Sequence, residues 1–70
     1  MRAVKTNTEI RQDQIARAAL VLISRHGFNR LNMAGVAREV GVVPSGIYRH
    51  YRNKDEVLDA VLELIRKVVS

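Results

Sequence analysis

The sequence has 70 residues and no cysteine, which limits it to one small domain without disulfides or thiolate metal sites. Its apolar runs fall far short of the roughly 18 residues that a membrane-spanning helix needs, so we expect a soluble, cytoplasmic protein without a membrane partner. The net charge is +5, and residues 1–54 hold ten basic residues against three acidic ones. A basic body is typical of a domain that faces a polyanion, although a solvated basic surface would have the same composition.

The first 26 residues predict a short arm followed by a long helix. Residues 1–8 lack hydrophobic periodicity and are expected to form a flexible N-terminal arm. A helix is expected from Glu9, with Thr8 as its N-cap. Gly27 should end this helix in a left-handed conformation, after which Phe28 can fold back onto the core. The apolar residues that recur at helical spacing are Ile15, Ala18, Ala19, Leu22 and Ile23.

A second, shorter helix is expected after Asn32, whose side chain suits an N-cap. Gly41 should make the turn that follows, and Val42 should anchor that turn in the core. The side chains expected to face inward from this helix are Met33, Val36, Ala37 and Val40.

Pro44 predicts the start of a third helix, because proline is well suited to the first helical position. The pair Ser45-Gly46 ordinarily indicates a turn. We nevertheless predict a helix, since Ile47 and Tyr51 keep helical spacing on what would be its buried side.

A fourth helix is predicted from a capping box in which Asn53 is the cap and Glu56 is the third helical residue. Its apolar residues lie on two sides: Val57, Val61, Leu64, Ile65 and Val68 on one, and Leu58, Leu62 and Val69 on the other. Because a lone helix end cannot bury both sides, we expect residues 53–70 to be the start of a helix that leads to an absent C-terminal domain or to another subunit. Fraying of a last helix is the simpler alternative.

These elements predict an all-α fold. It consists of a three-helix, homeodomain-like helix-turn-helix domain over residues 9–52, followed by the start of a fourth helix. In such domains the second helix of the motif lies in the DNA major groove, and its N-terminal residues reach the base edges.

The chemistry of the third helix fits this role. Val43 and Pro44 can contact thymine methyl groups, and Ser45 can donate or accept a hydrogen bond. The hydroxyl of Tyr48 is placed for a phosphate oxygen. Arg49 is the strongest candidate for base readout, because a guanidinium pairs with two acceptors of guanine.

His50 and Lys54 are expected to hold the flanking phosphates. Each residue has a simpler interpretation: Tyr48 as a half-buried core aromatic, Arg49 as a solvated charge, and His50 as an ordinary surface histidine. Lys54 could simply flank the capping box. Their occurrence together, after a glycine turn and without an acid among them, favours DNA binding.

The pattern formed by Gly41-Val42, Ile47-Tyr48, His50-Tyr51 and Lys54 resembles the N-terminal domain of the TetR family of bacterial transcriptional repressors. Gly27-Phe28, Val36-Ala37 and Leu58 extend the resemblance, which runs from about Ile15 to Val61. It implies a larger C-terminal domain that binds a small effector and forms a homodimer, and a palindromic double-stranded DNA operator.

The resemblance also implies where DNA is contacted. The candidate DNA-binding residues are Asn32, Val43, Pro44, Ser45, Gly46, Tyr48, Arg49, His50 and Lys54. Four positions depart from the family pattern. Met33 cannot make the phosphate bond of the threonine common in the family, Ala34 is too short to read a base, and Val43 replaces the usual capping serine. Gly46 commonly bears a side chain in relatives, so its contact is expected through the backbone.

We therefore expect a sequence-specific DNA-binding repressor that a small effector releases from its operator. The alternative is a helical protein-interaction module that uses the apolar faces of the fourth helix. An enzyme is disfavoured, because Ser24 and His26 do not face each other on a helix and no glycine-rich phosphate loop occurs. No cofactor or metal is expected. The sequence does not identify the operator, the effector or the regulated genes.

Overall fold

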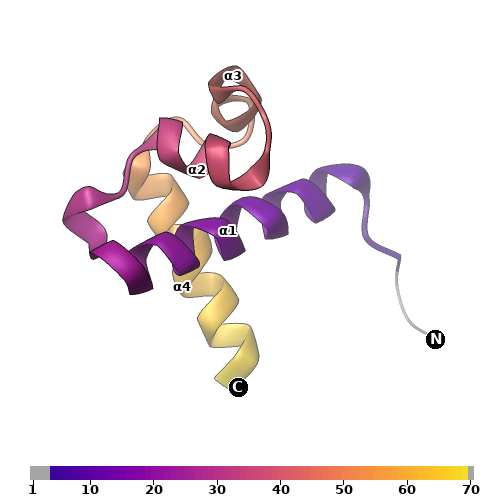
Figure 1. The fold of residues 1–70 in the computed structure, drawn as a ribbon. Helices are drawn as coiled ribbons and strands as arrows, with labels where there is room; N and C mark the ends of the chain where they lie inside the picture. Colours follow the sequence, from indigo (N-terminus) through magenta and orange to yellow (C-terminus); the bar gives the residue numbers. More distant parts are fainter. Residues whose placement is uncertain (1–3, 70) are drawn as a thin grey trace.

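The computed structural model describes residues 4–69, and this part of the chain is helical without strands. Its elements are α1 (Asn7–His26), the 3-10 turn η1 (Phe28–Arg30), α2 (Met33–Val40), α3 (Pro44–Tyr48) and α4 (Lys54–Val69). Figure 1 shows α2 and α3 on one side of the long α1, whereas α4 crosses α1 and its end projects to the other side. The predicted all-α helix-turn-helix fold with a fourth helix is confirmed.

Helix α1 begins two residues earlier than predicted, and Thr8 is not its cap. The N-cap is Thr6, whose hydroxyl accepts from the Glu9 amide while the Glu9 carboxylate accepts from the Thr6 amide, both at 3.1 Å. These bonds from Thr6 hold the pKa of Glu9 below its ordinary value. Of the predicted arm, residues 1–3 lie outside the described residues, and Asn7 and Thr8 are helical.

The end of α1 falls where it was predicted, although the glycine conformation differs. Gly27 follows His26 with a φ of 86°, which favours glycine, but its ψ of 158° lies outside the left-handed helical region. Its amide still donates to the Ile23 carbonyl at 2.8 Å. The chain then forms η1, and Phe28 packs half-buried against the core as expected.

Helix α4 has the predicted cap with one change. The Asn53 side chain accepts from the Glu56 amide at 3.0 Å, as in a capping box. The Glu56 carboxylate, however, accepts from the amide of Arg52 at 2.8 Å, one residue before the cap. The carboxylate therefore fixes the approach to α4 instead of closing the box on Asn53.

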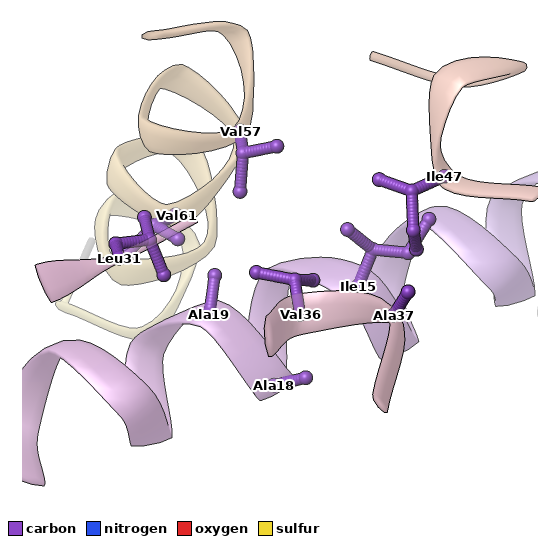
Figure 2. Close-up of a cluster of buried hydrophobic side chains, with 9 residues drawn as sticks. All are labelled: Ile15, Ala18, Ala19, Leu31, Val36, Ala37, Ile47, Val57 and Val61. Atoms are coloured by element: carbon purple, nitrogen blue, oxygen red, sulfur yellow. The ribbon is translucent and has the colours of Figure 1, made fainter. Parts of the chain in front are cut away.

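The core joins all four helices and is wholly aliphatic. Figure 2 shows side chains of α2 and α3 meeting α1 at one end of the cluster, and side chains of α4 meeting α1 at the other. Burial of each larger aliphatic side chain stabilises the fold by about 1.5–3 kcal/mol. The cluster therefore stabilises the packing of the other helices around α1. Its members are Ile15, Ala18, Ala19, Leu31, Val36, Ala37, Ile47, Val57 and Val61.

The two apolar sides of α4 are treated differently by the fold. Val57 and Val61 are buried against α1, and Leu58 and Leu64 are partly buried. The last turns remain uncovered within the described part of the chain: Leu62, Ile65, Val68 and Val69 are exposed, Val68 by 78%. The described residues therefore leave part of the apolar surface of α4 exposed, in agreement with the expectation that a lone helix end cannot bury both sides.

Candidate nucleic-acid interface

The turn between α2 and α3 is built around Gly41. This residue has φ 90° and ψ 31°, the left-handed conformation that is strained for other residues. The amides of Gly41 and Val42 both donate to the Ala37 carbonyl at 2.9 Å. Val42 packs partly buried against the core, as predicted. The turn thereby fixes the direction in which α3 leaves α2.

Helix α3 is short and is held by one fully buried side chain. It has five residues, and helical hydrogen bonding continues past its end, because the Arg49 amide donates to Ser45 and the Tyr51 amide donates to Ile47. Ile47 has no exposed surface and anchors the helix in the core. No side chain caps its N-terminus at Val43, which agrees with the predicted loss of the capping hydroxyl.

The opposite side of α3 is open to solvent. Val43 is 67% exposed and Tyr48 is 52% exposed, and Pro44 and Ser45 are exposed as well. About half of the Tyr48 side chain is thus covered, but Tyr48 is not among the partly buried side chains packed against the core cluster, whereas Tyr51 is. Between Val40 and Lys54 the sequence contains no acidic residue, so this surface presents hydroxyl donors and cations without a carboxylate of its own.

Asn32 stands at the N-terminus of α2, as predicted, and much of its side chain is engaged. Its oxygen Oδ1 accepts from the Gly35 amide at 2.7 Å, which is the expected cap. Its nitrogen Nδ2 donates to the Arg30 carbonyl at 3.4 Å. Only one hydrogen of the Asn32 side-chain amide remains for an external partner. A DNA contact by Asn32 could use that hydrogen, and it remains a prediction.

Lys54 is the first residue of α4 and lies over an aromatic ring. Its Nζ atom is 4.4 Å from the centre of the Phe28 ring, a cation–π contact that links α4 to η1. The sequence did not indicate this pairing, because the two residues lie 26 positions apart. The ring limits where the ammonium group can go, and it leaves the outer side of the cation available.

Arg49 and His50 lie beyond the last residue of α3 and face the start of α1. Together with residues of α1 they line a shallow surface hollow. The lining consists of Asn7, Thr8, Ile10, Arg11, Gln14, Arg49 and His50. None of these α1 residues was predicted from the sequence to belong to the site, because Arg11 lies far from Arg49 in the chain and only the tertiary fold brings both residues to one hollow.

The described residues contain no group of three or more histidines, cysteines or acids placed to bind a metal ion. No helix in residues 4–69 is both long and apolar enough to cross a bilayer. The site consists of α3, the second helix of the motif, which is anchored in the core by Ile47 and has an exposed outer surface without acidic residues. Fold and surface together define a helix-turn-helix domain of the DNA-binding kind.

Comparison with known proteins agrees with this class. Residues 15–61 match the family described as "Bacterial regulatory proteins, tetR family". An uncharacterized HTH-type transcriptional regulator of Haemophilus influenzae is 39% identical over 59 residues, which cover 84% of this chain and 30% of that protein. The class A tetracycline repressor protein from transposon 1721 of Escherichia coli is 36% identical over 56 residues, 80% of this chain and 26% of that protein.

A solved structure adds the same conclusion in three dimensions. A TetR-family transcriptional regulator from Haemophilus influenzae superposes with a TM-score of 0.76 at 33% identity, covering 81% of this chain and 32% of that one. The chain therefore belongs to the tetR family, as its N-terminal helix-turn-helix domain. Membership of this family of DNA-binding regulators agrees with the prediction that the chain is not an enzyme. The chain spans about 30% of the length of the relatives it matches.

Proposed function

We propose that this chain is the operator-reading domain of a cytoplasmic transcriptional repressor that acts as a homodimer on palindromic double-stranded DNA. The observation that carries the proposal is the outer surface of α3, which is exposed, free of acids and fixed from behind by Ile47. A relative named as a tetracycline repressor protein supports the repressing mode. By the same analogy, release from the operator would follow binding of a small effector to a C-terminal domain.

The proposed contacts divide by position on the motif. Val43, Pro44 and Ser45 would contact base edges in the major groove, with the backbone of Gly46 close to the DNA. Tyr48, His50 and Lys54 would hold phosphates and so position the helix without reading sequence. Asn32 would add a phosphate contact through its remaining amide hydrogen. This division rests on the exposure of α3 and on the residue chemistry.

The test is an in vitro selection of duplexes with the chain fused after residue 70 to a dimerising coiled coil. We expect a palindromic sequence to be enriched, with affinity that falls steeply between 50 and 200 mM salt, as phosphate binding requires. If the protein binds no duplex, even at the lowest salt, the proposed function is refuted.

Tyr48→Phe tests the positioning role of the tyrosine hydroxyl. The change removes one hydrogen-bond donor from an exposed ring and should leave the fold intact. We expect affinity for selected and random duplexes to fall by the same factor, because a phosphate contact carries no sequence information. Fluorescence anisotropy on both duplexes measures this factor, with Tyr51→Phe as a matched control away from the outer surface of α3. A loss confined to one base pair would contradict the assignment.

The second candidate, a protein-interaction module, is favoured by one observation. An apolar groove between α1 and the end of α4 is lined by Leu20, Val21, Leu64, Ile65 and Val68, with Arg17 at its side. Binding there would depend on apolar contact and would be nearly insensitive to salt. The salt series on DNA therefore distinguishes the two candidates.

A further inference from the structure

The hollow between α1 and the end of α3 has a chemistry that the helix-turn-helix motif alone does not explain. Two arginines, Arg11 and Arg49, border it together with His50 and the polar residues Asn7 and Thr8. These groups come from two elements that are nearly 40 positions apart in the sequence. A set of donors assembled from both elements suits an oxyanion.

The lining of the hollow includes no carboxylate, although α1 carries two acids nearby in sequence. Both acids are used elsewhere. Glu9 accepts from the Thr6 amide in the capping box, and Asp13 pairs with Lys5. Within residues 4–69, neither Arg11 nor Arg49 takes part in an ion pair. The positive charge of the hollow is therefore not neutralised by the described part of the chain.

The position of Arg49 also matters for what it can reach. In a helix-turn-helix the N-terminal residues of the second helix approach the bases. Arg49 follows the last residue of α3, a full turn beyond Ser45, and borders the hollow with α1. Arg49 is thus at the end of α3 that is far from the base-reading end, and it borders the same hollow as Arg11.

We propose that Arg11 and Arg49 form a shared site for the DNA backbone phosphate, with Thr8 and Asn7 as additional donors. This inference rests on the proposed function. It replaces the expectation from the sequence that Arg49 reads guanine, because Arg49 then positions the domain. It also extends the DNA-binding surface from the helix-turn-helix to the first two turns of α1. A guanidinium suits this role because it can donate two parallel hydrogen bonds to a phosphate.

The test compares Arg11→Ala, Arg49→Ala and the double variant on the selected duplex and on duplexes that differ at each base pair. We expect each single variant to lose the same factor on every duplex. It should also flatten the slope of log affinity against log salt by about 0.9 per half-site, or about 1.8 for the dimer. If the two residues share one phosphate, the double variant should lose less than the product of the two single losses.

Arg25→Ala is the matched control, since Arg25 is an exposed arginine of α1 that does not border the hollow. It removes the same net charge, so any loss it causes measures the long-range field alone. Arg11→Lys, which keeps the charge but not the forked donors, should fall between the wild type and Arg11→Ala. Circular dichroism verifies that each variant is folded.

The outcomes separate the two proposals. A loss by Arg49→Ala that is confined to one base pair would overturn the inference in favour of base readout. Equal behaviour of Arg11→Ala and Arg25→Ala would overturn it too, since the hollow would then make no local contact. In both cases the wild type still binds DNA, whereas failure of the proposed function means that the wild type binds no duplex.

Discussion

At the scale of single residues, the fold does not require a glycine at Gly46, whereas close approach of DNA to the backbone would. It lies inside α3 without a positive φ, and a Cβ placed there would meet Val42 at 3.6 Å, an ordinary contact. The fold therefore accepts a side chain, although glycine destabilises a helix interior by about 1 kcal/mol relative to alanine. The absence of a structural need supports a role for Gly46 in letting DNA approach the backbone.

Gly46→Ala tests this role. We expect the variant to be more stable by about 0.5–1 kcal/mol, because alanine favours the helix and the unfolded chain loses freedom. Affinity for the selected duplex should decrease at the same time, since a methyl group would stand between backbone and DNA. Urea unfolding and anisotropy measure the two effects. Unchanged affinity in a stabilised variant would show that close approach at Gly46 is not used.

At the scale of elements, capping hydrogen bonds mark the starts of α1, α2 and α4, whereas α3 begins at Pro44 without a side-chain cap. The sequence placed Asn32, Gly41, Pro44 and Asn53 correctly, because each has a strong preference for its position. The prediction of Thr8 as the cap of α1 was wrong. Thr6 is the cap, and it precedes Glu9 by three residues, which is the spacing of a capping box. The signal for the correct start was therefore present in the sequence.

Asn32→Ala tests how far α2 depends on its cap. Loss of the bond to the Gly35 amide should lower the free energy of unfolding by about 1 kcal/mol, because α2 has eight residues and few other local stabilising bonds. Thermal unfolding measures the change. Asn29→Ala in η1 is the control, an exposed asparagine that should change stability by less than about 0.5 kcal/mol. Equal effects of both variants would contradict the capping role.

At the scale of the whole molecule, Tyr51 connects three parts of the fold. It follows α3 and borders a hollow whose other walls are Asp13 and neighbouring residues of α1, and Glu63 and Lys67 of α4. Burial raises the pKa of the Tyr51 hydroxyl, and the charge of Asp13 raises it further. The neutral ring is thus favoured in the folded protein, and its ionisation should weaken the junction of all three parts.

The sign of the pH dependence follows from this shift. Because the folded pKa lies above the unfolded value of about 10, the stabilisation is complete below pH 10 and is lost as the pH rises through the folded pKa. We expect Tyr51→Phe to reduce the loss of thermal stability between pH 9 and 11, whereas Tyr48→Phe should leave that loss unchanged. Lysine titration affects all variants alike. Identical pH profiles for the wild type and Tyr51→Phe would refute this role.

The sequence by itself determined the helices, the glycine turn and the candidate surface of α3, because these depend on periodicity and on residues with strong local preferences. It also indicated that the end of α4 exposes more apolar surface than this chain covers. Tertiary structure alone decided the pairing of Lys54 with Phe28 and of Arg49 with the start of α1. These contacts join residues far apart in the chain, so they depend on how the aliphatic core sets α3 and α4 against α1, which local patterns do not encode.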